Sequence, residues 1–154
     1  MTWLGMYWAG TPNLQMLDNA TVRLDTDNEV QPDALLRIEV KGQSTISSDD
    51  SVEGAPELIV EIAASSASLD FNQKLNIYRR NQVQEYLVWR FYDEVCDWFC
   101  LHEGKYLPLM VNSSGNFCSK IFLGLWLSLS ALLSGNPAGV LTVLQQGLAS
   151  PEYQ

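Results

Sequence analysis

The chain has 154 residues, 47% of them hydrophobic, and its nine Lys and Arg against eighteen Asp and Glu give a formal charge of -9. This length can close one sizeable core and is short for two, so we expect a single domain over residues 1–154, of the α/β or α+β class. The acidic excess excludes a protein whose whole surface attracts phosphate, so any contact with DNA must be local.

Cysteine number and the apolar stretches indicate the compartment. Three cysteines, an odd number, do not form a closed disulfide framework and are typical of a reducing environment, which predicts a cytoplasmic protein. No basic residue precedes Arg23, and Gly5 and Gly10 interrupt the first apolar stretch, so a signal peptide is not expected. Residues 121–133 would extend roughly 20 Å as a helix, against roughly 30 Å of bilayer hydrocarbon, so no membrane span is predicted.

Strand signals occur three times in the first 63 residues, at residues 20–24, 33–40 and 57–63. In the first, Val22 and Leu24 alternate with polar neighbours, and the second follows Pro32, whose missing N–H is tolerated where a strand begins. The third strand, ELIVEIA, has the strongest signal, because it is rich in β-branched residues. Residues 41–56, between the last two, are rich in Gly, Ser and Asp and predict a surface loop.

The next segment predicts a helix near residues 69–80, with serine hydroxyls at residues 65–68 available for its N-cap. Phe71, Leu75 and Tyr78 share one inward face of that helix. Three further strands, joined by tight turns, are expected at residues 84–90, 95–102 and 105–110.

A helical tail at about residues 125–149 is expected to close the chain. Its first helix is predicted near residues 125–133, and its second opens with Asn136 as N-cap and Pro137 in the first turn. Trp89, Trp98 and Trp126 lie among apolar residues, so we expect them to anchor the core or an interface.

Glu61 is the most informative polar residue of the third strand. Alternation puts its side chain on the same face as Ile59 and Ala63, so a carboxylate stands among apolar neighbours. Burying an unpaired carboxylate is expensive. Two interpretations remain open: this face is solvated at that level, or Glu61 has a cation or a metal as its partner.

Lys74 and Asp33 are the other candidates. Lys74 borders the apolar face of its helix, and an ion pair with Asp70 at i,i+4 is the simplest interpretation. Asp33 alone is ordinary for a turn. Together with Glu61, however, the three residues have the types that phosphodiester hydrolysis needs, because carboxylates hold Mg²⁺ and a cation steadies the attacking water or the developing charge.

Cys96, Cys100 and His102 resemble a metal cluster only at first sight. On one strand the two cysteines would lie roughly 13 Å apart, and a zinc ion with bonds of about 2.3 Å cannot bridge them. Glu39 and Glu57 are likewise excluded as partners of the candidate acids, because they would lie roughly 20 Å along the strand from Asp33 and roughly 13 Å from Glu61, respectively.

Four motifs follow one another along the chain, namely Gln31-Pro32-Asp33, Gly54-Ala55-Pro56-Glu57-Leu58-Ile59-Val60-Glu61-Ile62, Asp70…Lys74…Tyr78 and Val83-Gln84-Glu85-Tyr86. Their order resembles that of the Uma2 family of restriction-endonuclease-like proteins, which is common in cyanobacteria. The resemblance runs from about Asn19 to the first C-terminal helix. It implies the PD-(D/E)xK fold, in which a mixed β-sheet flanked by helices presents acids and a lysine to a divalent metal.

The resemblance also implies roles for individual residues. Asp33 and Glu61 are expected to bind Mg²⁺ or Mn²⁺, with the backbone carbonyl of Ile62 as a third ligand and Lys74 as the catalytic cation. Ala63 stands where the classical motif has its lysine, so Lys74 would act from the helix instead. Family members usually have a further N-terminal helix, first strand and acids, so this chain is expected to begin late.

Two functions remain open on this basis. The first is a Mg²⁺-dependent endonuclease that hydrolyses DNA, with Arg79 and Arg80 as possible phosphate contacts, although solvated surface charge is the alternative for both arginines. The second is a catalytically inactive scaffold or protein-interaction module, a possible homodimer, in which the acids and Lys74 only pair with one another. The acidic net charge favours the second.

Overall fold

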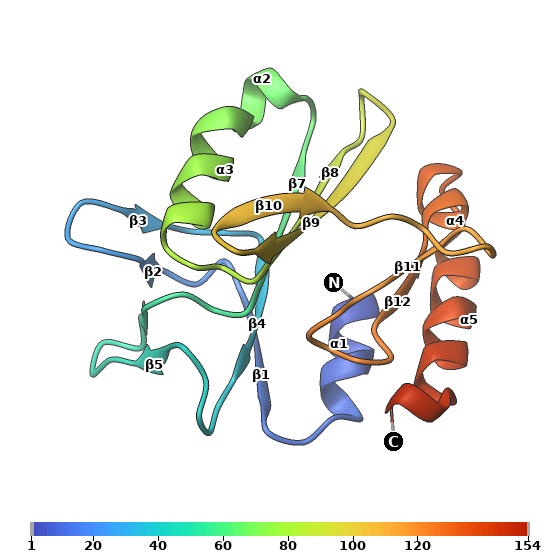
Figure 1. Ribbon diagram of the computed structural model, residues 1–154, viewed down its shortest axis with the longest axis horizontal. Coiled ribbons are helices and arrows are strands. Elements are labelled where there is room, and N and C mark those ends of the chain that lie inside the picture. Colours follow the sequence, from blue (N-terminus) through green and yellow to red (C-terminus); the bar gives the residue numbers. More distant parts are fainter. Residues whose placement is uncertain (1, 154) are drawn as a thin grey trace.

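A six-stranded mixed sheet forms the centre of the chain (Figure 1). A computed structural model of the protein describes residues 2–153, without the side chains of residues 68 and 69. In order across the sheet the strands are β1 (Leu14–Asp18), β4 (Ala34–Ile38), β7 (Leu58–Ala63), β8 (Glu85–Arg90), β9 (Val95–His102) and β10 (Lys105–Pro108). Strands β7 and β8 are parallel, and the other neighbouring pairs of this sheet are antiparallel.

The parallel pair requires a crossover connection, which α2 (Ser66–Leu69) and α3 (Phe71–Arg80) provide. One helix was predicted here, near residues 69–80. The structure has two, because Asp70 adopts a left-handed backbone conformation with φ of 54° and interrupts them. The sheet and its flanking helices confirm the α/β architecture predicted from the sequence.

Helix α1 (Thr2–Ala9) and strand β1 precede the first strand that the sequence predicted. No sequence pattern predicted α1, which has no charged residue and contains Gly5. Tertiary contacts hold it instead: the indole N–H of Trp3 donates to the carbonyl of Trp126 at 2.9 Å, and the Tyr7 hydroxyl donates to the carbonyl of Leu123 at 2.8 Å. Helix α1 therefore depends on residues far along the chain.

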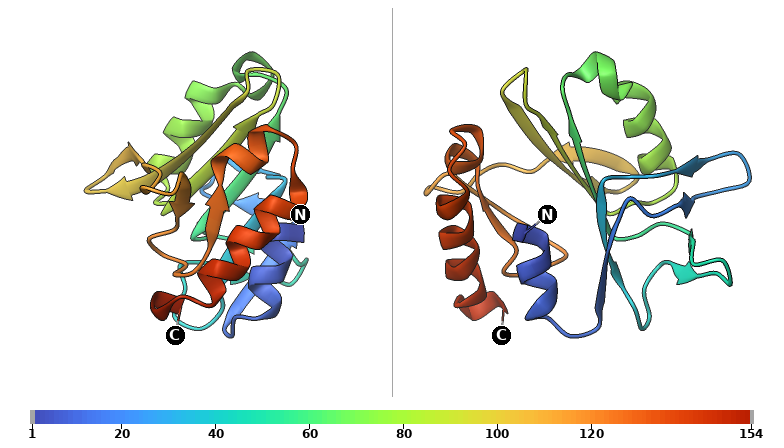
Figure 2. Two further views of the ribbon diagram at one scale, coloured as in Figure 1. Left: turned by 90° about the vertical axis from the view of Figure 1, so that its right-hand side faces the viewer. Right: turned by 180° about the vertical axis from the view of Figure 1, so that it is seen from behind.

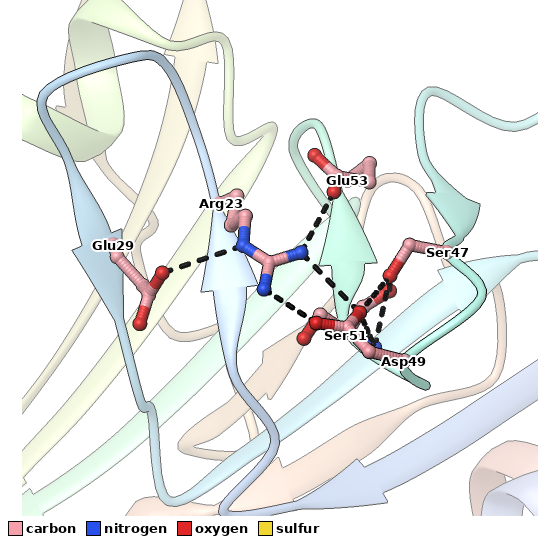
Figure 3. A network of polar contacts seen from close by, with 6 residues as sticks. All are labelled: Arg23, Glu29, Ser47, Asp49, Ser51 and Glu53. Carbon is pink, nitrogen blue, oxygen red and sulfur yellow. Dashed lines mark hydrogen bonds and ion pairs between the residues drawn. The ribbon is translucent and has the colours of Figure 1, made fainter.

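A second, small sheet has the order β3–β2–β6–β5 and consists of β3 (Glu29–Val30), β2 (Val22–Arg23), β6 (Val52–Glu53) and β5 (Thr45–Ile46). Strand β2 lies in the strand predicted at residues 20–24, whereas β5 and β6 lie in the segment predicted as a loop. Arg23 joins this sheet to its loops, with ion pairs to Glu29 at 3.3 Å, Asp49 at 2.6 Å and Glu53 at 2.9 Å (Figure 3). Hydrogen bonds from Arg23 and Ser47 lower the pKa of Asp49.

The C-terminal part contains β11 (Asn116–Cys118), β12 (Trp126–Ser128), α4 (Leu129–Leu133), α5 (Pro137–Leu148) and the short 3₁₀ helix η1 (Pro151–Tyr153). The prediction that the helical tail begins at residue 125 was wrong, because residues 126–128 pair with β11 as a strand. Helix α4 starts only after Ser128, whose hydroxyl accepts from the N–H of Ala131. The predicted N-cap of α5 is confirmed, since the Asn136 side chain accepts from the N–H of Gly139 at 3.1 Å.

Two hydrophobic clusters cover the two faces of the central sheet. On one face α1 and α5 pack over a cluster that includes Val60 and Leu87. On the other face Tyr78 of α3 packs in a cluster with Ile59 and Val88. Figures 1 and 2 show α3 on one side of β7 and β8, and α1 with α5 on the other. Within the described residues, no helix has both the length and the apolar character that a membrane crossing requires.

The close contact between α5 and the loop before β12 can be tested at Gly147. A Cβ atom there would meet the carbonyl oxygen of Gly124 at 2.2 Å and Cγ of Trp126 at 2.8 Å. We expect Gly147→Ala to lower the free energy of unfolding by about 2 kcal/mol. Gly5→Ala, also in a helix, is the matched control. A Cβ atom there would meet Sδ of Met16 at 3.8 Å, so the free energy of unfolding is expected to rise by about 0.5–1 kcal/mol. Urea unfolding followed by circular dichroism measures both, and equal effects would contradict the packing described.

Candidate active site

The carboxylate of Glu61 lies on the face of β7 that is covered by α3, and the residue is only 2% exposed. Its Oε1 accepts from Nζ of Lys74 at 3.1 Å and from the hydroxyl of Tyr78 at 2.5 Å. Its Oε2 accepts from the hydroxyl of Tyr86 at 2.9 Å. Of the two interpretations left open by the sequence, a buried Glu61 with a cationic partner is therefore the one that the structure supports.

Tyr78 comes from α3 and Tyr86 from β8, and both elements follow β7 along the chain. Tyr86 lies on β8 opposite Ile59, one position along the face from Glu61, and its ring centroid is 4.9 Å from that of Tyr78. From the sequence, Tyr78 was expected on the inward face of its helix, and Tyr86 had no predicted role. The available signal was that a buried tyrosine hydroxyl needs a partner, and Glu61 faces the same side of the sheet.

Burial raises the pKa of both tyrosines far above the ordinary value of about 10, and the negative charge of Glu61 raises it further. For Tyr78 the charge of Asp33 makes a smaller contribution in the same direction. Both hydroxyls therefore stay protonated at neutral pH and remain hydrogen-bond donors to Glu61.

Lys74 reaches Glu61 from the first half of α3, and its side chain is 30% exposed. The ion pair between Asp70 and Lys74 that the sequence suggested does not occur among the ion pairs of the described residues, because Asp70 lies outside α3 with a left-handed backbone. Lys74 is thus a cation that contacts a buried acid and solvent at once.

Asp33 immediately precedes β4, and its Oδ2 accepts the backbone N–H of Ile62 at 2.7 Å. Strand β4 pairs with β7 only from Ala34 opposite Val60, so the Asp33 side chain continues the pairing where the backbone ladder ends. The N–H and C=O of a strand residue point to the same side, so the Ile62 carbonyl faces the edge on which Asp33 lies. The structure thereby brings Asp33, Ile62 and Glu61 to one end of β7.

The oxygen atoms of Asp33, Glu61 and the Ile62 carbonyl are few, but they are of the type that Mg²⁺ takes as ligands. Within residues 2–153, apart from the two side chains left out, no group of three or more His, Cys, Asp and Glu is arranged to hold a metal. Mg²⁺ is, however, often held by one or two carboxylates and keeps several waters. Glu61 uses three acceptor positions for its protein donors, and a carboxylate has about four, so one remains on Oε2. By ligand type, the two acids and the Ile62 carbonyl are therefore the groups that would hold a Mg²⁺ ion, with water completing its shell.

The structure does not bring Arg79 or Arg80 to these acids. Arg79 donates to the side chain of Asn76 at 2.7 Å and to the carbonyl of Gly104, in the turn between β9 and β10, at 3.4 Å. Arg80 is the exposed last residue of α3. Contact of either arginine with DNA stays a prediction.

Other polar residues of the sheet have structural partners. Glu57 is buried and accepts hydrogen bonds from the backbone N–H groups of Ile38 at 2.9 Å and Gln43 at 2.8 Å. Its carboxylate therefore holds the end of β4 against the segment that follows it. Cys96 and Cys100 lie on β9, and burial raises the pKa of each thiol to about 12. Neither thiol is a nucleophile at neutral pH.

An apolar cavity of about 500 Å³ lies on the opposite face of the sheet from Glu61. Val60, Ile62 and Trp89 line it from the sheet, and residues of α1, α4 and α5 close it. Its lining contains no acid, so the carboxylate site and the cavity are separate features.

Comparisons with known proteins place this fold. Residues 3–130 match the model of the Uma2 family, described as "Putative restriction endonuclease". Matching solved structures include the crystal structure of a putative nuclease from Anabaena variabilis ATCC 29413, with a TM-score of 0.64, 11% sequence identity, and coverage of 86% of this chain and 75% of that chain. At that identity the likeness is one of fold. The comparison with curated proteins gave no match.

The raised pKa values of Tyr78 and Tyr86 predict a specific loss of stability in alkali. Above pH 10 the unfolded chain loses tyrosine protons that the folded protein keeps. The contribution of the two hydroxyls to the free energy of unfolding is therefore intact below pH 10 and falls as pH rises. Each such group adds a slope of up to about 1.4 kcal/mol per pH unit. We expect Tyr78→Phe and Tyr86→Phe each to make that slope shallower by this amount, and the double variant by twice as much. Urea unfolding between pH 9 and about pH 11 measures the slopes, and identical slopes in all variants would contradict the assignment.

Proposed function

The chain belongs to the Uma2 family, and from that premise we propose that it is a Mg²⁺-dependent endonuclease that hydrolyses DNA phosphodiester bonds. The observation that carries the proposal is the meeting of Asp33, Glu61, the Ile62 carbonyl and Lys74 at one end of β7. Two carboxylates with a carbonyl suit a hard divalent cation, and Lys74 supplies a further positive charge. Ala63 in the classical lysine position agrees with this role, since Lys74 reaches Glu61 from the helix.

In the proposed reaction the oxygen of a water forms a bond to phosphorus, and the bond from phosphorus to the leaving sugar oxygen breaks. The water loses a proton to solvent, and the leaving oxygen takes one up. Asp33, Glu61 and the Ile62 carbonyl would hold Mg²⁺, which would supply charge that polarises the phosphate and acidifies water. Lys74 orients the water and opposes the developing negative charge. Tyr78 and Tyr86 are positioning residues that fix the carboxylate of Glu61.

A catalytically inactive scaffold, a protein-interaction module with a possible homodimer, is the second candidate. The observation in its favour is that Glu61 already has three protein donors, which satisfy a buried carboxylate without a metal. The charge of -9 also works against binding a polyanion. In this case Lys74 and Glu61 form a structural ion pair and nothing more.

Cleavage of supercoiled plasmid DNA in Mg²⁺ or Mn²⁺ tests the enzyme directly. We expect the Glu61→Gln, Lys74→Ala double variant to lose at least about 100-fold in rate, because it removes a ligand charge and the catalytic cation. A matched control is Glu39→Gln, Lys105→Ala, which changes the same charges at two exposed residues away from β7 and should cleave as the wild type does. If the wild-type protein cleaves no more than the double variant, the enzyme proposal fails.

Calorimetric titration with Mn²⁺ separates the two candidates without any substrate. Asp33→Asn keeps an oxygen for the Ile62 N–H but removes the charge, so the nuclease model expects affinity for Mn²⁺ to fall by about tenfold or more. Asp50→Asn, at an exposed acid in the loop between β5 and β6, is the control and should bind as before. If no heat of Mn²⁺ binding is detected, or if Asp33→Asn leaves that heat unchanged, the result supports the scaffold.

A further inference from the structure

The tip of the β8–β9 hairpin carries exposed aromatic side chains where turns are usually polar. Phe91 is 41% exposed and Tyr92 is 78% exposed, and their ring centroids lie 4.8 Å apart at an angle of 62°. Trp89, at the end of β8, lies against Phe91 with ring centroids 6.2 Å apart. Single exposed apolar residues are common, but adjacent rings form a continuous surface and indicate a binding site.

This aromatic tip, defined as Phe91 and Tyr92, is held in place by backbone hydrogen bonds. The N–H of Phe91 donates to the carbonyl of Ala63 at 3.0 Å, and the N–H of Tyr92 donates to the carbonyl of Ala64 at 2.9 Å. Asp93, the next residue, accepts the N–H of Ser66 at the start of α2 at 3.3 Å. The rings are therefore presented on a fixed backbone, and little conformational entropy is lost when they bind.

The backbone of the aromatic tip pairs with the chain at and just beyond the end of β7 that carries the candidate active site. Ala63 is two residues beyond Glu61, about 7 Å along the strand, and directly follows Ile62, whose N–H binds Asp33. Figures 1 and 2 show α2 and the β8–β9 hairpin tip at the same end of the central sheet.

Charge decides which form of DNA such a surface suits. Binding to a duplex rests largely on phosphate contacts, and a chain with a charge of -9 has few to offer. Arg90, the basic residue nearest the tip in sequence, is already used by Asp97 and lies 4.7 Å over the ring of Phe71. Stacking on aromatic side chains needs no cation, but it needs a free base face, which an unpaired strand offers.

We propose that Phe91 and Tyr92 form a stacking platform for unpaired bases, so that the substrate class is single-stranded or unpaired DNA. The proposal rests on the proposed function for the chemistry at Glu61, whereas the binding itself does not depend on it. The platform supplies affinity that the acidic surface lacks.

The test is fluorescence anisotropy of the full chain with a labelled oligo-dT of about 15 nucleotides and with its duplex, in EDTA and about 50 mM salt. We expect the single strand to bind more tightly than the duplex. Tyr92→Leu should weaken single-strand binding about fivefold or more, and Tyr92→Phe should keep it, because only the first removes the ring. Trp8→Leu, which removes a ring that is 44% exposed on α1, is the matched control and should have no effect.

The outcomes separate this inference from the proposed function. Preference for the duplex, no binding of oligo-dT, or binding unchanged by Tyr92→Leu overturns the platform even if DNA is cleaved. Binding that depends on Tyr92, without cleavage above the Glu61→Gln, Lys74→Ala variant, overturns the nuclease and leaves the platform. If Tyr92→Leu instead lowers the sedimentation coefficient of the protein alone, the tip is a self-association surface and the platform is overturned.

Discussion

The buried carboxylate of Glu61 is the constraint on which the centre of this protein depends. An isolated charge at that depth would cost several kcal/mol or more, and three donors offset this cost. Tyr78 and Lys74 reach it from α3 and Tyr86 from β8, so the parallel pair of strands and its crossover helix meet at one carboxylate. The polar contacts that fix α3 against the sheet are the same contacts that set the charge of the candidate site. Local stability and site chemistry therefore cannot be altered independently here.

The other buried glutamates show why Glu61 differs from a structural acid. Glu57 is satisfied by two backbone N–H groups, and Glu85 by the hydroxyl of Ser119 and the N–H of Lys120. Three of these four donors are backbone N–H groups, so the two acids tie the chain together. Glu61 is held by side chains, one of which, Lys74, also reaches solvent. An acid with one partly exposed side-chain partner can exchange that donor for a ligand more readily than an acid held by backbone N–H groups.

Local patterns in the sequence predicted those features whose cause is local. Residues 95–102 were predicted as a strand with the bounds that β9 has, and Asn136 as the N-cap of α5, because alternation and capping act within a few residues. The apolar run before residue 133 was assigned wholly to a helix, since periodicity cannot separate a short buried strand from a buried helix. The bond from Asp33 to Ile62 and the two tyrosines around Glu61 join separate elements, so no local pattern could place them. The identities of Asp33, Glu61 and Lys74 came from residue type and motif order, and their roles in catalysis remain predictions.

Helix α1 has a consequence for how the chain acquires its structure. Trp3 and Tyr7 bind the carbonyls of Trp126 and Leu123, partners that are 123 and 116 residues later in the sequence. At a synthesis rate of roughly 5–20 residues per second, this uncharged segment is synthesised about 6–24 s before its partners exist. During that interval the cluster that Trp3 and Leu4 join lacks its late members, which include Leu125 and Leu144. Completion of this first hydrophobic cluster is therefore a late step of folding.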